Sequence, residues 1–168
     1  MQKYIKKSMR KIKINSGNGL KLKGTLVIKK YKNGKLIWQS SPMSNLVVSG
    51  SGGYGRNLIM RRLAGDATYG IAIDSARIGD GTTPPADSDT NLQNVLVSGI
   101  SITNAVVSND GVQFDIFVSS ATLPDDTYAE FGLFIGGRLF SRVLISPTYT
   151  KATGEDTTFS YTIQASSS

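Results

Sequence analysis

The amino-acid sequence predicts a mainly β protein: an antiparallel β-sandwich with one short helix, preceded by a basic N-terminal arm and a hairpin. The chain of 168 residues holds 18 glycines and only 18% charged residues, which is typical of short strands linked by turns. Apolar and polar residues alternate in several short stretches, as at 112–118 and 159–163. Asn-Gly, Asp-Gly and Gly-Gly pairs stand between such stretches, and these pairs favour hairpin turns.

The N-terminal arm is predicted over residues 1–20. Its basic side chains follow one another too closely to pack inside a core, and the Asn-Ser-Gly-Asn-Gly stretch at 15–19 is typical of a turn or hinge. Apolar residues interleave with the basic ones, so we expect the arm to order against a partner. The basic residues assigned to partner binding are Lys3, Lys6, Lys7, Arg10, Lys11 and Lys13, and the interleaved apolar residues are Tyr4, Ile5, Met9, Ile12 and Ile14.

Residues 21–43 are predicted to form a β-hairpin that serves as an attachment segment. Runs rich in strand-forming residues at 24–31 and 35–39 flank Asn33-Gly34, a pair that accepts the positive φ angles of a type I′ turn. Leu or Ile at positions 20, 22, 26 and 28 alternates with Lys or Thr at 21, 23 and 25, which indicates one apolar face. Tyr31 and Trp38 complete the predicted partner-binding residues. With Tyr54 they also suggest an alternative, an aromatic patch that stacks on sugars.

The sandwich domain is predicted over residues 44–168 and contains the single helix. Residues 56–64 have a helical pattern, and Gly65 is placed to end it. The apolar stripe of this helix consists of Leu58, Ile59, Met60 and Leu63. A strand at 71–79 runs into a loop. Further strands are predicted at 93–98, 100–107, 111–119, 127–135, 138–145 and 157–164, with hairpin turns at 109–111 and 136–137.

Charge divides the chain into two parts. Residues 1–65 carry 15 Lys and Arg and no acidic residue, whereas residues 66–168 carry 4 basic and 12 acidic residues. This asymmetry favours a basic leading part that seats on an acidic neighbouring subunit, and a copy of this chain offers such a surface. Binding of nucleic acid by the arm is the alternative.

Reactive side chains are scarce. Histidine and cysteine are absent, which removes the commonest general base and every thiol mechanism, so we expect no enzyme, no cofactor and no metal. Asp125-Asp126 lie in a predicted turn, so they are expected to be solvated turn residues and not a catalytic pair. Residues 87–92 open like a calcium loop, but Leu92 stands where glycine is needed, so a short helical turn capped by Asp87 or Asp89 is expected instead. Residues 50–55 lack the lysine of a phosphate loop and are expected to be a flexible linker into the helix.

The sequence also shows no pattern typical of a membrane span or of an export signal. No apolar run approaches the length of a membrane span, and the basic start leads into no apolar stretch of a signal peptide. We therefore expect no membrane partner and synthesis in a cytoplasm.

Several short motifs follow one another from about residue 44 onward. They are Asn45-Leu46-Val47-Val48, Gly55-Arg56-Asn57-Leu58-Ile59, Leu63-Ala64-Gly65, Ile78-Gly79-Asp80-Gly81-Thr82-Thr83-Pro84-Pro85, Asp89-Thr90-Asn91-Leu92, Tyr128-Ala129-Glu130-Phe131-Gly132-Leu133-Phe134, Gly137-Arg138-Leu139-Phe140-Ser141-Arg142 and Tyr149-Thr150-Lys151. As an ordered set they resemble bacteriophage virion structural proteins of the tail-collar and tail-fibre type.

The resemblance implies a non-enzymatic virion structural protein with no catalytic residues to carry over. Expected positions are the tail, collar or neck, baseplate or fibre attachment of the particle, after synthesis in the host cytoplasm. Expected partners are sister copies, in a homo-oligomer such as a trimer or ring, and other virion structural proteins. The alternatives are a receptor- or glycan-binding module at a tail tip, or nucleic-acid binding through the basic arm. Residues 1–40 lie outside the recognised pattern.

Overall fold

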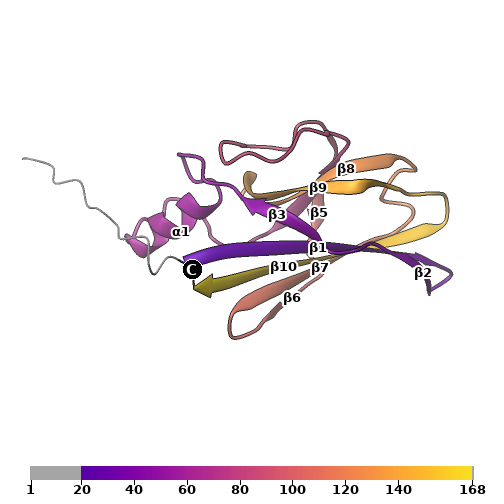
Figure 1. Ribbon diagram of the computed structural model, residues 1–168, viewed down its shortest axis with the longest axis horizontal. Coiled ribbons are helices and arrows are strands. Elements are labelled where there is room, and N and C mark those ends of the chain that lie inside the picture. Colours follow the sequence, from indigo (N-terminus) through magenta and orange to yellow (C-terminus); the bar gives the residue numbers. More distant parts are fainter. Residues whose placement is uncertain (1–19, 168) are drawn as a thin grey trace, which may run out of the picture.

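A computed structural model describes residues 20–167 of the chain (Figure 1). Its elements are strands joined by tight turns or longer loops, and they include one helix within the described residues. Their bounds are β1 Leu20–Lys32, β2 Lys35–Gln39, β3 Met43–Val47, α1 Arg56–Leu63, β4 Ser75–Gly79, β5 Val95–Ser101, β6 Asn104–Val107, β7 Gly111–Val118, β8 Thr127–Ile135, β9 Arg138–Thr150 and β10 Glu155–Ser167.

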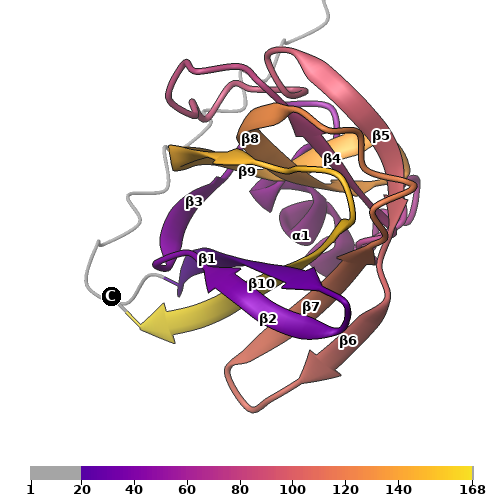
Figure 2. The ribbon, with the colours of Figure 1, turned by 90° about the vertical axis from the view of Figure 1, so that its right-hand side faces the viewer.

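The strands form one antiparallel sheet that curls into two facing layers (Figure 2). The order is β5-β4-β8-β9-β3-β1-β10-β7-β6, and β2 pairs with β1 beside this path. Strand β3 joins the layers, since Met43 and Ser44 pair with β1 while residues 45–47 pair with β9. The mainly β, sandwich-like fold predicted from the sequence is confirmed.

The core fills the space between the layers. Phe131 of β8 stacks on Phe159 of β10 with ring centroids 4.6 Å apart, so the two layers meet through aromatic contact. Strand β8 is buried on both faces: residues 128–135 are all buried, with Phe131 and Leu133 facing this core and Phe134 facing a second cluster. That second cluster consists of Val48, Leu92, Phe134 and Leu139, beneath the loop that joins β4 to β5.

The hairpin segment is an integral part of the sandwich. Strand β1 pairs with β10 along all 13 of its residues, and Leu26 and Ile28 are fully buried. The proposed boundary at residue 43 therefore separates no independent unit. The turn itself has the predicted form, with φ angles of 50° at Asn33 and 72° at Gly34.

The helix is present, but its buried stripe is narrower than predicted. Gly65 takes a φ of 80°, and its N–H donates to the Arg62 carbonyl, which ends the helix. Leu58 is buried, whereas Leu63 is 77% exposed and Met60 is 53% exposed. The prediction for these two residues was wrong because the short helix packs through one side of its first turns only.

Several strand boundaries also differ from the prediction, and three of them have a clear structural reason. Residues 71–74 are not a strand, because Ile73 packs over the end of the core instead of joining the ladder. Strand β5 continues through Gly99, which lies in a bulge with a φ of 69°, so the break falls at 102–103. Strand β9 extends to Thr150, past a bulge opposite β8 near Pro147.

Candidate functional site

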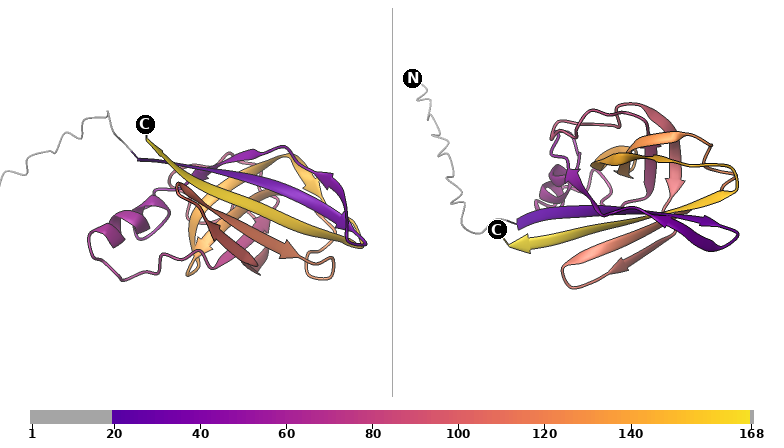
Figure 3. Two further views of the ribbon diagram at one scale, coloured as in Figure 1. Left: turned by 90° about the horizontal axis from the view of Figure 1, so that it is seen from below. Right: turned by 45° about the vertical axis from the view of Figure 1, so that its right-hand side comes forward.

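The predicted partner-binding residues fall into two groups. The six basic residues of the arm, Lys3, Lys6, Lys7, Arg10, Lys11 and Lys13, lie outside the described residues. Tyr31 and Trp38 lie in the β1–β2 hairpin, at the end of the molecule opposite α1 (Figure 3).

Trp38 rests on a cluster at the base of the hairpin. Its ring stacks on Tyr149 with centroids 5.8 Å apart, and the Lys30 ammonium lies 5.9 Å from the Trp38 ring and 5.3 Å from the Tyr149 ring. Lys30 also forms an ion pair with Glu155 at 3.0 Å. The hairpin is thus braced against β9 and β10 by aromatic and charged contacts.

The environment shifts the pKa of two members of this cluster. Burial raises the pKa of Tyr149 to about 12. Burial also raises the pKa of Glu155, but hydrogen bonds from the Ala152 N–H and from Lys30 outweigh it, so its pKa lies below the usual value. Both groups therefore keep the charge state that their contacts need at neutral pH.

The other two aromatic candidates lie elsewhere. Tyr31 pairs with Leu36 and follows Lys30 in β1, so its side chain points to the sheet face opposite that of Trp38. Tyr54 packs against the second cluster under the β4–β5 loop. The three side chains do not form one aromatic patch.

The outer strand of the hairpin exposes three apolar side chains, of which sequence reasoning singled out Trp38 but not Leu36 or Ile37. All five residues of β2 are exposed, with Leu36 at 52%, Ile37 at 50% and Trp38 at 39%. The signal in the sequence is that three consecutive residues are apolar, so the alternation expected for a half-buried strand is missing. Strand β2 pairs only with β1, which leaves its outer edge without a strand partner among residues 20–167.

Lysines surround these apolar side chains. Lys29, Lys32 and Lys35 form no ion pair within the described residues, unlike Lys30. An exposed apolar strand with unpaired cations beside it is suited to contact with an apolar and acidic surface. The hairpin patch includes side chains on both faces of the hairpin and is defined here as Lys29, Tyr31, Lys32, Lys35, Leu36, Ile37 and Trp38.

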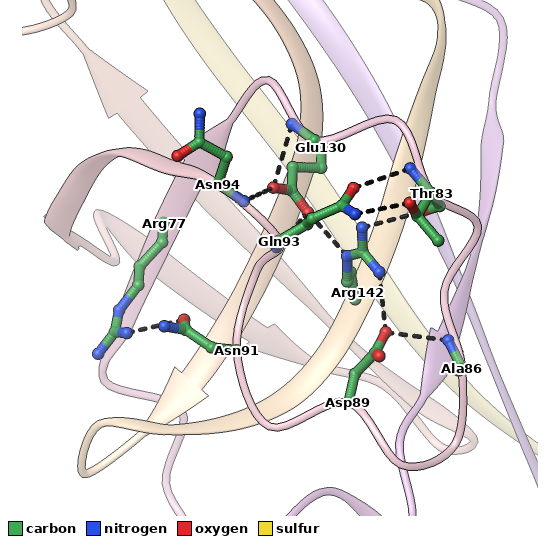
Figure 4. Close-up of polar contacts among 10 residues, drawn as sticks. Arg77, Thr83, Ala86, Asp89, Asn91, Gln93, Asn94, Glu130 and Arg142 are labelled. Carbon is green, nitrogen blue, oxygen red and sulfur yellow. Dashed lines mark hydrogen bonds and ion pairs between the residues drawn. The ribbon is translucent and has the colours of Figure 1, made fainter.

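A buried polar centre lies between the sheet and the β4–β5 loop, where the Glu130 side chain is fully buried (Figure 4). Its carboxylate accepts hydrogen bonds from the backbone N–H groups of Gly81, Gln93 and Asn94 at 3.2, 3.0 and 2.7 Å. It also accepts from Arg142 Nε at 2.8 Å. Four donors leave this carboxylate no free position for a reacting group.

Arg142 extends the same network to the middle of the β4–β5 loop (Figure 4). One terminal nitrogen donates to the Asp89 carboxylate and the other to the Thr83 carbonyl, each at 2.8 Å. Glu130 and Arg142 together hold both ends and the middle of a loop that lacks regular structure. The centre anchors this loop on the sheet, and its geometry offers no catalytic position.

The carboxylates of Asp125 and Asp87, which were considered from the sequence, are each paired with a basic side chain. Asp125 accepts hydrogen bonds from Lys151, at 2.6 Å, and from Thr153, and the bond from Lys151 holds its pKa below the usual value. Asp87 pairs with Arg56 at the surface. Across the part of the chain that the structure describes, no group of three carboxylates is arranged to hold a metal ion.

Two loops differ from their predicted form. Leu92 lies buried in the second cluster and not in a helical turn, and Asp89 accepts from the Ala86 N–H within an irregular loop. Residues 50–55 are held in place and are not a free linker, since the Gly55 N–H donates to the Leu139 carbonyl at 3.1 Å and the Arg56 N–H that follows donates to the Val48 carbonyl at 2.8 Å. A side chain at Gly55 would collide with that same carbonyl.

Comparison with known proteins adds no assignment, since the chain matches no family model, no curated protein and no solved structure. Helix α1, the one helix in residues 20–167, is not long and apolar enough to cross a membrane. Residues 20–167 form a sandwich-like, mainly β fold with an exposed apolar edge strand, β2.

Proposed function

We propose that this chain is a non-enzymatic structural protein of a bacteriophage virion, which assembles in several copies and docks other virion proteins through the hairpin patch. The observation that carries the docking role is strand β2, whose five residues are all exposed and which places Leu36, Ile37 and Trp38 beside unpaired lysines. Its place in the particle is the tail, collar or neck, baseplate or a fibre attachment.

The docking mechanism follows from the free edge of β2. An extended segment of the partner adds to this edge by backbone hydrogen bonds, and its alternate side chains contact the exposed apolar residues. Carboxylates of the partner pair with Lys32 and Lys35 near the hairpin tip, which fixes the register and speeds encounter. The partner segment is therefore extended, apolar at its centre and acidic at its flanks.

The virion assignment rests on the ordered motifs, and the buried network supplies a physical reason for several of them. Gly81 comes from the Gly-Asp-Gly motif, Glu130 from the Glu-Phe-Gly motif and Arg142 from the Leu-Phe-Ser-Arg motif. These residues contact one another, although 61 positions separate the first from the last. Because Gly81, Glu130 and Arg142 act together to fix the β4–β5 loop, they support the interpretation of these motifs as one ordered set.

Particles made by the genome that encodes this chain test the proposal. We expect mass spectrometry to detect the chain in purified particles. The double variant Leu36→Asp/Ile37→Asp should fold with an unchanged melting temperature, because both positions are exposed, but should be lost from particles. Leu96→Asp is the matched control, since Leu96 is exposed to a similar degree on β5. Absence of the chain from particles, or normal incorporation of the double variant, would contradict the proposal.

A second function is favoured by a pocket of about 230 Å³ beside Trp38. Gln39, Ser40 and Ser41 supply amide and hydroxyl groups next to the exposed indole, and this combination suits a sugar ring. In that case the chain binds a glycan receptor at a tail tip. Particles carrying Trp38→Ala would then assemble normally yet fail to adsorb to host cells, whereas normal adsorption would remove this function.

A further inference from the structure

An apolar pocket lies at the end of the sandwich opposite the hairpin patch. It has a volume of about 430 Å³, and every side chain that lines it is apolar. The floor is the inner face of β1, β10, β7 and β6, through Leu22, Ile163, Val112 and Val107, and Ile59 of α1 and Ile71 cover it in part. Figure 1 shows α1 beside this end of the sheet.

The pocket opens along the edge of the sheet. Val107 is 80% exposed and Ile71 is 40% exposed, although both line the pocket, so the opening lies between them. The edge strand there is β6, which pairs only with β7 within residues 20–167. Its four residues are uncharged and exposed, and they include no proline or bulge that would block a further strand.

These two features share residues, and this determines the kind of ligand that fits. Ala105 and Val107 belong both to the free edge and to the pocket wall. A strand that adds to β6 would continue the inner face of the sheet, so every second side chain would enter the pocket. The ligand is therefore an extended peptide with branched apolar residues two positions apart and polar residues between them.

Residues 11–14 of this chain have that pattern. They read Lys-Ile-Lys-Ile, which places Ile12 and Ile14 on one face of a strand and Lys11 and Lys13 on the other. The segment belongs to the 19 residues that precede the described part of the chain. Its lysines would lie on the solvent side of a body whose residues 66–168 carry eight more acidic than basic residues, so the charges are complementary.

Distance decides whether the segment comes from the same chain or from a second copy. Three strand spacings separate β1 from β6, and an added strand lies one spacing further, about 19 Å from β1 in total. The six residue steps from Leu20 back to Ile14 span at most about 21 Å when fully extended. The same chain would reach the site only if residues 15–19 ran straight across the sheet, with none left for the turn predicted there.

We propose that residues 11–14 of a second copy add to β6 and insert Ile12 and Ile14 into the apolar pocket. The contact links copies of the chain through exchanged N-terminal arms. This inference deepens the multi-copy part of the proposed function and rests on it, while it is independent of docking at the hairpin patch.

Disulfide trapping tests the contact on the full-length chain, which contains no cysteine of its own. Two single variants, Ile14→Cys and Val107→Cys, are mixed and oxidised gently, with Ala105→Cys as a parallel partner for the neighbouring register. We expect a disulfide-linked pair between the two variants. Lys13→Cys mixed with Val107→Cys is the control, and it should give at least about tenfold less product because opposite-facing side chains cannot meet disulfide geometry.

The outcomes separate the possible occupants. A link within single chains of the double variant Ile14→Cys/Val107→Cys, seen at high dilution without linked pairs, would overturn the second-copy assignment. No link in any combination would overturn the site itself. Light scattering gives an independent readout, since Ile12→Asp/Ile14→Asp should reduce the mass in solution to that of a monomer. Neither failure affects the incorporation test on Leu36 and Ile37, so the two proposals can fail separately.

Discussion

Arg142 donates from Nε to the Glu130 carboxylate over 2.8 Å, and both side chains are almost fully buried. Replacing Glu130 with Ala leaves the buried guanidinium with Asp89 as its one carboxylate partner and removes the acceptor for three loop N–H groups. We expect Glu130→Ala to lower the free energy of unfolding by about 3–5 kcal/mol, measured by urea denaturation.

A surface ion pair gives the control for that measurement. Arg56 and Asp87 lie 2.7 Å apart, with side chains 41% and 63% exposed. Arg56→Ala should change stability by no more than about 1 kcal/mol, since solvent screens an exposed pair. If both variants lost the same small amount, the buried network would not anchor the loop.

The two phenylalanines of β8 face different clusters, yet both are fully buried. Phe131→Ala and Phe134→Ala should each cost about 3–5 kcal/mol of unfolding free energy, because each leaves a cavity in a packed region. Phe117 of β7, which is 49% exposed, is the comparison, and Phe117→Ala should cost clearly less. A loss below about 1 kcal/mol at both β8 positions would contradict their placement.

Alkaline titration should reveal the buried tyrosines. Burial raises the pKa of Tyr128 and of Tyr149 to about 12. Their phenols ionise near pH 10 in the unfolded chain, so their contribution to stability is complete below about pH 10 and is lost as pH rises through about 12. Ultraviolet absorbance of phenolate should show late ionisation in the folded protein, whereas the chain in urea should titrate at ordinary values. Coincident curves would show that the two rings are accessible.

Trp38 is the only tryptophan, so its fluorescence reports on the hairpin alone. Because the side chain is 39% exposed, we expect acrylamide to quench the free protein readily. Docking of a partner on the hairpin patch should reduce that quenching. Partner binding through the patch with no change in quenching would place the contact away from Trp38.

Local chemistry explains which parts of the fold the sequence predicts well. Asn33-Gly34 and Gly136-Gly137 form hairpin turns because their backbones accept positive φ angles, whatever the rest of the chain does. The alternation in β7 correctly marks Phe114 and Ile116 as buried. Such features depend on near neighbours only.

Other features depend on contacts between distant residues and could not be predicted this way. Met60 and Leu63 look like core residues on the helix, but no element packs on their side. Ile73 has strand character, yet it covers the end of the core. Glu130 stands in an apolar run, which signals a buried charge, but its partners lie between 12 and 49 positions away.

The continuous pairing of β1 with β10 has a mechanical consequence. A pull applied at the hairpin tip is transmitted along β1 toward Leu20, parallel to the strand. Hydrogen bonds of an antiparallel ladder lie across the strands, so this tension loads the whole 13-residue ladder in shear and cannot open it one rung at a time. The hairpin should therefore resist mechanical separation from the rest of the sheet, because many hydrogen bonds must break together.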